Sequence, residues 1–336
     1  MKKILIVKFG ALGDVVRTTF FLSGLKKKNF TIYFLTANSS FELLRYNPHI
    51  DQIILPSLNL SIIYEHEFDH VYSLDDEKEI LSLVQKVTTQ NYTGAFLDTN
   101  GLSHYTKNSA TWFDMGLLSR YGKNEADRLK KINQQTHAEI FQTIFQTQAN
   151  AEFFNAPHIE HRVKTYLKSL INNEKIIKIG INSGAGERWE SKALPIKEVI
   201  KLIELILAIP EPKIHIFLFG GAQELNRHQT ITQAITSSRL IDTGNHHQLL
   251  EFAALIKQMD YLISSDSLAL HLAIAQQVKN LSFYAPTSAA EIATFGTGVK
   301  VVSSSPDYCD YKKEARKNDL TAEKIFATFQ SWVKSP

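Results

Sequence analysis

Short apolar runs alternate with amphipathic stretches along most of the chain, and this alternation restricts the possible folds more than any other feature. The runs are rich in β-branched residues and are separated by stretches of about 10–15 residues with helical periodicity. Continuous apolar runs of this kind predict parallel strands that are covered on both faces. The first half contains the runs Ile4–Phe9, Thr31–Leu35, Asp51–Leu55, His70–Leu74 and Gly94–Asp98. The second half contains the runs Ile176–Asn182, Lys213–Phe219, Arg239–Asp242, Tyr261–Ser264, Asn280–Ala285 and Val299–Ser303.

The helical stretches and the length of the chain predict two α/β domains. In the first half the stretches are Val15–Lys28 and Glu77–Thr89. In the second half they are Pro195–Ala208, Gln223–Thr236, His247–Met259, Ser267–Ala275 and Thr321–Lys334. A chain of 336 residues exceeds one ordinary core, and residues 105–151 lose the alternation and predict exposed helix. We expect doubly wound domains over 1–160 and 161–336 that face each other across a cleft, with ligands beyond the carboxyl ends of the strands.

Composition and missing motifs exclude several classes of protein. A net charge of +3 gives no argument for binding nucleic acid, and a single cysteine, Cys309, excludes an internal disulfide framework. No stretch approaches the ~20 apolar residues of a membrane span, and no signal peptide is evident, so we expect a cytoplasmic protein. The P-loop, the nucleophile elbow and the three-glycine dinucleotide fingerprint are missing, and no Asp-x-Asp pair is available for a divalent cation. The histidines that could be considered as metal ligands are more simply surface residues: His158, His161, His246 and His247.

Four loops that follow strands carry the residues suited to chemistry. They read "FGALGD" (9–14), "NSGAGERWESKALP" (182–195), "FGGAQE" (219–224) and "SSDSLALHLA" (264–273). The glycines of the 182–195 loop let main-chain N–H groups approach an anion. Arg188 and Lys192 in the same loop supply the positive charge that a diphosphate requires. A glycine turn with two solvated cations is the alternative.

The acidic residues of the other loops each have a structural and a functional interpretation. Asp266 lies between two serines at a strand-to-helix junction, where it is either a helix N-cap or part of a phosphate-binding wall with His271. Glu224 either favours the dipole of its helix or contacts a ribose or sugar hydroxyl. Asp14 cannot hold phosphate, since it is negative; it is either another N-cap or a base that takes a proton from a hydroxyl.

The four loops, in this order, resemble those of glycosyltransferase family 9, the heptosyltransferases. The resemblance rests on "GALGDVVRTT", "NSGAGERWESKALP", "FGGAQE", "SSDSLALHLAIA" and "FYAPTS", and it covers nearly the whole chain. It implies a GT-B architecture of two Rossmann-like domains, in which the N-terminal domain binds the acceptor and the C-terminal domain binds a nucleotide-sugar donor. Leu268 stands where the family has a glycine, Leu194 replaces a tryptophan, and Cys309 is alone where many relatives carry several cysteines.

The resemblance also implies the reaction and its residues. The reaction is an inverting, metal-independent transfer of a sugar from ADP-heptose to a glycan or glycolipid hydroxyl, with Asp14 as the catalytic base and no cofactor. The resemblance assigns Lys192, Glu224, Asp266, Ser267 and His271 to the donor. The chemistry of the two loops adds Ser183, Gly184, Gly186, Arg188 and Ser265 as donor-binding residues. Pro286 and Thr287 are weaker matches to a Gly-Pro-Thr motif of the family. The rival functions are a sugar-nucleotide epimerase of the same architecture and a nucleotide-sugar-binding protein without activity.

A region of the first half that is rich in basic and aromatic residues is the candidate binding region for the acceptor. Its basic cluster could hold an anionic glycolipid at the inner membrane surface, or it could be a solvated helix. The residues that we assign to the acceptor are Gly13, Arg17, Trp112, Arg120, Lys123 and Arg128. Lys130 and Lys131 belong to the same cluster.

Overall fold

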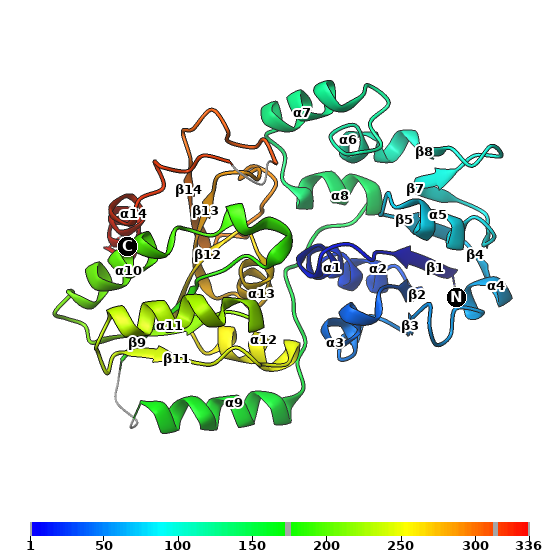
Figure 1. The fold of residues 1–336 in the computed structure, drawn as a ribbon. Coiled ribbons are helices and arrows are strands. Elements are labelled where there is room, and N and C mark those ends of the chain that lie inside the picture. The colour runs from blue at the N-terminus through cyan, green and yellow to red at the C-terminus, as the bar shows by residue number, and fades with distance from the viewer. Residues whose placement is uncertain (1, 172–175, 312–314, 335–336) are drawn as a thin grey trace. The chain divides into compact units, whose positions relative to one another are not determined.

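The computed structural model describes residues 2–171, 176–311 and 315–334, without the side chains of 187–189. The chain divides into two compact units (Figure 1). Unit 1 comprises Met1–Phe154 and Ala290–Ala293, and unit 2 comprises Asn155–Ala289 and Thr294–Pro336. The expected boundary at 160/161 lies inside helix α9 (Pro157–Leu170).

Unit 1 is built on a six-stranded sheet of order β3-β2-β1-β5-β7-β8. All neighbouring strands are parallel except β7 and β8, which pair antiparallel. The strands are β1 (Lys2–Val7), β2 (Phe30–Leu35), β3 (Gln52–Ile54), β5 (His70–Ser73), β7 (Tyr92–Leu97) and β8 (Ser103–Tyr105). A separate pair of short parallel strands consists of β4 (Glu67–Phe68) and β6 (Thr88–Thr89).

Helices cover both faces of this sheet, as the continuous apolar runs predict. The α-helices are α1 (Leu12–Thr19), α2 (Leu22–Lys27), α3 (Phe41–Leu44), α4 (Ile62–Glu65), α5 (Lys78–Val84), α6 (Ala110–Phe113), α7 (Lys123–Ile132) and α8 (His137–Phe145). Residues Ile4–Val7 of β1 are fully buried. Leu5 and Val7 share a core with α4 and α5. Because alternate side chains of a strand point to opposite faces, Ile4 and Ile6 are buried on the other face.

Unit 2 contains a fully parallel sheet of order β11-β10-β9-β12-β13-β14. The strands are β9 (Ile177–Asn182), β10 (Ile214–Phe219), β11 (Leu240–Asp242), β12 (Tyr261–Ser265), β13 (Lys279–Tyr284) and β14 (Gly298–Val302). The remaining helices are α10 (Ile196–Leu207), α11 (Leu225–Ala234), α12 (Leu249–Lys257), α13 (Leu268–Ala275) and α14 (Ala322–Lys334). Helices α10, α11 and α14 share one core with the strands. The prediction of two doubly wound parallel sheets is confirmed.

Three expectations for the first half need correction. Residues 15–28 do not form one helix, because α1 ends at Thr19 and α2 begins at Leu22. The helix expected over 77–89 ends at Val84, and 88–89 form β6. Part of 105–151 is not exposed, since α8 buries the side chains that recur on one of its faces. They are His137, Ile140, Phe141, Ile144 and Phe145.

Helix α8 joins the core of unit 1 through aromatic packing. Phe21 lies between α1 and α2 and stacks on Phe145 at 5.0 Å between ring centroids, and Tyr72 lies 4.8 Å from the same ring. The first turn of α8 also binds the short segment 290–293, since the His137 N–H donates to the carbonyl of Glu291 at 2.8 Å. This segment therefore belongs to unit 1, although its neighbours in sequence belong to unit 2.

Candidate active site

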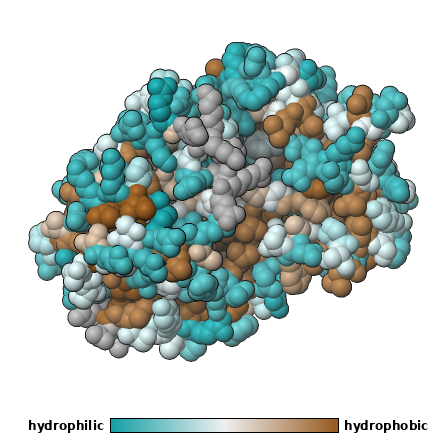
Figure 2. All heavy atoms as spheres, viewed as in Figure 1, coloured by the Kyte–Doolittle hydropathy of each residue, from teal (hydrophilic) through white to brown (hydrophobic). Residues whose placement is uncertain are grey.

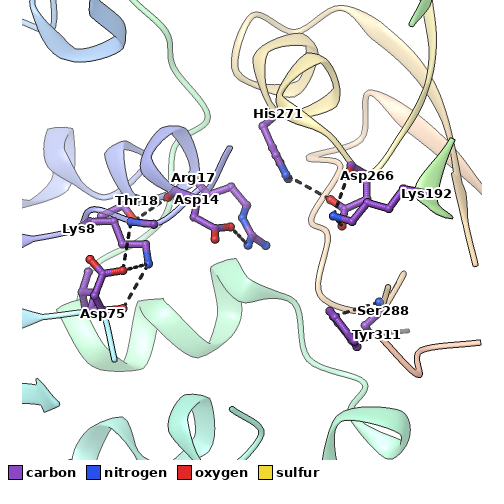
Figure 3. A network of polar contacts seen from close by, with 12 residues as sticks. Lys8, Asp14, Arg17, Thr18, Asp75, Lys192, Asp266, His271, Ser288 and Tyr311 are labelled. Carbon is purple, nitrogen blue, oxygen red and sulfur yellow. Dashed lines mark hydrogen bonds and ion pairs between the residues drawn. The ribbon is translucent and has the colours of Figure 1, made fainter. Parts of the chain in front are cut away.

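The turn after β1 places Asp14 in the first turn of α1, where it is not the N-cap. The N-cap is Ala11, and the Asp14 N–H donates to the carbonyl of Ala11 at 2.8 Å. The Asp14 carboxylate instead accepts a hydrogen bond from Arg17 Nη2 (Figure 3). The Asp14 side chain is one-third exposed, whereas the Arg17 side chain is almost covered. The carboxylate is thus oriented by a guanidinium one turn along the helix.

A buried ion pair that we did not predict lies beneath this turn. Lys8 Nζ donates to Asp75 Oδ1 at 2.6 Å and to the carbonyl of Leu74 at 3.4 Å. Asp75 also accepts the N–H groups of Phe9 and Gly10, so one carboxylate fixes three donors of the turn. The pair forms because β1 and β5 are neighbours in register, with Val7 opposite Ser73. A signal existed in the sequence: each residue follows an apolar run.

The ion pair shapes the electrostatics around Asp14. Burial lowers the pKa of Lys8, but attraction to Asp75 and then to Asp14, with the hydrogen bond to Asp75, outweighs burial, so its pKa is raised. Lys8 therefore stays protonated at neutral pH. The ammonium contributes a fixed positive charge beside the turn that presents Asp14.

The other residues assigned to the acceptor are more dispersed. Gly13 and Arg17 lie on α1 with Asp14, whereas Trp112 packs edge-on against His137 and Phe141 at 5.3 and 5.1 Å. Besides Arg17, the three basic residues of this set are all paired with nearby carboxylates. The pairs are Arg120 with Asp114 at 3.0 Å, Lys123 with Asp127 at 2.5 Å and Arg128 with Glu125 at 2.7 Å. The surface over α7 is correspondingly hydrophilic (Figure 2).

In unit 2 the carboxyl ends of neighbouring strands bring the predicted donor residues together. Asn182, the last residue of β9, donates through Nδ2 to the carbonyl of Gly184 at 2.9 Å and to the hydroxyls of Ser264 and Ser267. It therefore ties the glycine loop to the loop after β12. Ser267 is the N-cap of α13, which begins at Leu268. Asp266 is not the cap, so its carboxylate has another role.

Three buried hydroxyls at this edge lack a hydrogen-bond partner among the described residues. They belong to Ser183 after β9, Ser265 at the end of β12 and Thr287 after β13, and each residue is at most 2% exposed. Because β9, β12 and β13 are consecutive in the sheet, the hydroxyls follow adjacent strands about 4.8 Å apart. Buried hydroxyls are normally bonded, so this group is suited to a polar ligand.

Lys192, Asp266 and His271 form a connected cluster beside these hydroxyls. Lys192 Nζ donates to Asp266 Oδ2 and to the Asp266 carbonyl, both at 3.1 Å, and His271 Nε2 lies 3.3 Å from Asp266 Oδ1 (Figure 3). All three side chains are largely covered. Asp266 thus holds the lysine at the helix start, where N–H groups and a cation together attract an anion.

Glu224 links the two glycine loops. Its carboxylate accepts the N–H of Gly221 at 2.7 Å and that of Gly186 at 3.4 Å, and the residue is 8% exposed. A Cβ on Gly184 would overlap the Glu224 carboxylate, which explains the glycine there. Gly186 has a φ of +72°, which also favours glycine. The Arg188 side chain, the remaining predicted donor contact, lies outside the described part of the structure.

Three further properties concern metal ligands, membrane spans and the cysteine. Across 2–171, 176–311 and 315–334, no three or more histidine, cysteine or acidic side chains are grouped as metal ligands would be. No helix in these ranges has the length and apolar character needed to span a bilayer. Cys309 is buried and is not disulfide-bonded.

Comparisons with known proteins give the family of the chain. The family model of glycosyltransferase family 9 (heptosyltransferase) matches residues 118–322. Lipopolysaccharide heptosyltransferase 1 of Campylobacter coli is 23% identical, and the match covers 96% of this chain and 95% of that protein.

Solved structures of similar proteins extend the likeness to the fold of the whole chain. A family 9 glycosyltransferase of Veillonella parvula has a TM-score of 0.76 at 17% identity, covering 99% of this chain and 98% of the other. E. coli ADP-heptose lps heptosyltransferase II has a TM-score of 0.68 at 15% identity, covering 98% of each chain. The GT-B fold class is thereby confirmed. The chain belongs to glycosyltransferase family 9, the heptosyltransferases, and is a glycosyltransferase.

Proposed function

We propose that this glycosyltransferase moves a heptosyl group from ADP-heptose to a hydroxyl of a lipopolysaccharide-type acceptor, with inversion and without a metal ion. The family assignment and the names of the relatives support the donor and the acceptor. In this proposal, unit 2 binds the nucleotide sugar and unit 1 binds the acceptor. The reaction takes place in the cytoplasm.

The observation that carries the proposal is the chemistry at the carboxyl edge of the second sheet. The hydroxyls of Ser183, Ser265 and Thr287 are buried and available as donors, and Lys192 adds a positive charge at the start of α13. A diphosphate presents many acceptor oxygens and negative charge, so hydroxyls, main-chain N–H groups and an ammonium are its natural partners. Glu224, at the same edge, suits a ribose or sugar hydroxyl.

Asp14 is the proposed base. It takes the proton of the acceptor hydroxyl while that oxygen forms a bond to the anomeric carbon of the donor. The bond from this carbon to the diphosphate oxygen breaks, and the nucleoside diphosphate leaves from the opposite face with the electron pair. Lys192 and the main-chain N–H groups stabilise the charge on the leaving group. Arg17 orients the Asp14 carboxylate.

The same residues support a reaction without a divalent cation. Two carboxylates at the donor edge, those of Asp266 and Glu224, already have partners: Asp266 binds Lys192 and His271, and Glu224 accepts two glycine N–H groups. Recruiting either carboxylate to a metal ion would break these contacts. The cationic and N–H donors at this edge then carry the charge of the leaving diphosphate.

The test is Asp14→Asn, which removes the base but preserves the size of the side chain. We expect ADP to bind with unchanged affinity in calorimetry, while turnover with ADP-heptose and a lipopolysaccharide-core acceptor falls about 100-fold or more. Asp51→Asn is the matched control, because Asp51 also pairs with a cation in unit 1, Lys26 at 2.8 Å.

Three results would count against the proposal. Turnover retained in Asp14→Asn would remove Asp14 as the base. Donor consumption without an acceptor would identify an epimerase or hydrolase instead. Binding of ADP-heptose without turnover on any acceptor would favour the inactive binding protein.

We also propose that the region around α7 meets the inner membrane surface when the acceptor is a glycolipid. Arg120, Lys123 and Arg128 are exposed there beside Tyr121 and Ile132, which are 57% and 55% exposed. Basic and amphipathic side chains of this kind attract anionic lipid surfaces. Their pairing with acidic neighbours makes any such attraction modest.

A further inference from the structure

The main chain on both sides of Lys192 is held by two cations from distant parts of unit 2. Lys317 Nζ donates to the carbonyl of Ser191 at 2.7 Å and also to the carbonyl of Ala193. Arg227 Nη2, on α11, donates to the carbonyl of Leu194 at 2.7 Å. Lys192 is therefore flanked by two carbonyls that share one ammonium group.

These carbonyls need donors because of where they lie. The 3₁₀ helix η3 (Glu187–Lys192) ends at Lys192, and the last carbonyls of a helix have no partner within it. Ser191, Ala193 and Leu194 are all buried, with exposed fractions of 6%, 4% and 3%. A buried carbonyl without a donor is costly, and a cation at the carboxyl end of a helix is favourable.

The residues on both sides of Lys317 are fixed by ion pairs and hydrogen bonds. The preceding residue, Arg316, binds Asp307 through its main-chain N at 2.9 Å and its Nε at 2.7 Å. Asp319 accepts the Ser303 hydroxyl and the Ser304 N–H, both at 2.6 Å. These contacts hold the segment that carries Lys317 against the loop after β14, and so they fix the position of the ammonium group.

We infer that Lys317 is a positioning residue for the donor, because it fixes the main chain that presents Lys192 to the diphosphate. This inference rests on the proposed role of Lys192 in binding a nucleoside diphosphate. Lys317 acts through the two carbonyls, and Arg227 holds the next carbonyl in the same way.

The charge of Lys317 makes this contact sensitive to pH. Burial and the positive charge of Arg227 lower the pKa of Lys317 to about 8, while Glu190 acts in the opposite direction. Burial likewise lowers the pKa of Arg227, against the charges of Glu224 and Glu190. Below pH 8 the ammonium makes charge-assisted bonds to both carbonyls, and above pH 8 it becomes a neutral amine that binds them more weakly.

Deprotonation of Lys317 does not destabilise the folded chain, so a loss of donor affinity at high pH would not arise from unfolding driven by this residue. The pKa of Lys317 in the folded chain is below its ordinary value of 10.5. Between about pH 8 and 10.5 the unfolded chain therefore binds more protons, and this group alone makes stability rise with pH. Affinity and stability are expected to change in opposite directions.

The experiment compares ADP binding by calorimetry in the wild type, Lys317→Met, Lys317→Arg and Lys28→Met. We expect Lys317→Met to weaken ADP binding by about tenfold or more, and Lys317→Arg to restore most of the affinity. Lys28→Met is the matched control, since Lys28 also donates to a main-chain carbonyl, that of Gln146 in unit 1, at 2.5 Å. Wild-type affinity should fall from about pH 7 to about pH 9.5, and this fall should be much smaller in Lys317→Arg.

Hydrogen exchange of residues 190–194 in the ligand-free protein gives a readout independent of the donor. We expect faster exchange there in Lys317→Met and unchanged exchange in Lys28→Met. Unchanged ADP affinity in Lys317→Met, or weaker affinity with unchanged exchange at 190–194, would overturn the inference. A wild type that binds neither ADP nor ADP-heptose would overturn the proposed function, and exchange would then decide the positioning role alone.

Discussion

Replacing Asp75 by alanine tests how strongly the turn that presents Asp14 depends on the buried ion pair. Asp75 is 6% exposed and accepts Lys8 Nζ at 2.6 Å, the Gly10 N–H at 3.2 Å and the Phe9 N–H. Lys8 is 8% exposed, so alanine at 75 leaves a nearly buried ammonium without its counterion. Breaking a buried pair from one side costs about 3–5 kcal/mol, and we expect this loss in the free energy of unfolding of unit 1.

Two further variants separate the charge from the packing. Asp75→Asn keeps an acceptor oxygen but removes the charge, so we expect a smaller loss of about 1.5–3 kcal/mol. Combining Lys8→Met with Asp75→Leu removes both charges, and we expect this double variant to be more stable than Asp75→Ala. The pKa of Lys8 is raised above its ordinary 10.5, so its contribution is fully present below that pH and is lost only as pH rises further. In Asp75→Ala, burial acts on Lys8 without the attraction of Asp75 and lowers its pKa, so the loss should be smaller at pH 9 than at pH 7.

Urea unfolding of unit 1 can be followed through one tryptophan. The chain has three tryptophans, and Trp112 is the one in unit 1, packed against His137 and Phe141. With Trp189→Phe and Trp332→Phe as background, the fluorescence of Trp112 reports the transition of that unit. A loss below about 1 kcal/mol in Asp75→Ala, within the range of an exposed pair, would refute the reasoning.

Three other predictions follow from the two candidate sites. Gly184→Ala places a methyl group against the Glu224 carboxylate, so ADP affinity in calorimetry should fall about tenfold or more; unchanged affinity would mean that the two loops are free to separate. Exhaustive dialysis against EDTA should leave the transferase rate unchanged, and a loss restored by Mg²⁺ would contradict the metal-free proposal. Vesicles containing anionic lipid should sediment the protein, and Lys123→Ala with Arg128→Ala should weaken this several-fold, less than the about fivefold per charge of unpaired cations because both are ion-paired; equal binding by the double variant would exclude α7 as the contact.

The second sheet could be predicted from sequence almost residue by residue, but parts of the first half could not. Each strand of unit 2 lies within one residue of its expected bounds, because glycine and polar loops end each apolar run. No glycine or proline marks the break between α1 and α2 at Phe20–Phe21, where both rings are buried. The burial of α8 was predictable, since Ile140, Phe141 and Ile144 recur at helical spacing.

The meeting of the loops after the strands at one edge of the sheet was predictable, whereas contacts with distant segments were not. Glu224 and Asp266 stand in glycine- or serine-rich loops, and the structure brings both to the same edge of the second sheet. Asp75 reaches Lys8 because β1 and β5 are neighbours, and Lys317 reaches Ser191 from the far end of the chain. Lys8 and Asp75 each follow an apolar run, but nothing in the local sequence pairs them, and no apolar run marks Lys317. The N-cap interpretation of Asp14 and Asp266 is wrong, since Ala11 and Ser267 occupy those positions.

The segment Ala290–Ala293 limits how this enzyme can be cut or recombined. It belongs to unit 1 by its contacts, and the carbonyl of Glu291 receives the first N–H of α8. A fragment that stops at Phe154 would lack this segment, and the first N–H of α8 would lose its hydrogen bond to the Glu291 carbonyl. A chimera that exchanges halves between relatives would therefore have to take residues 290–293 from the same parent as the N-terminal half. Otherwise the segment that contacts the first turn of α8 would come from a different protein than α8 itself.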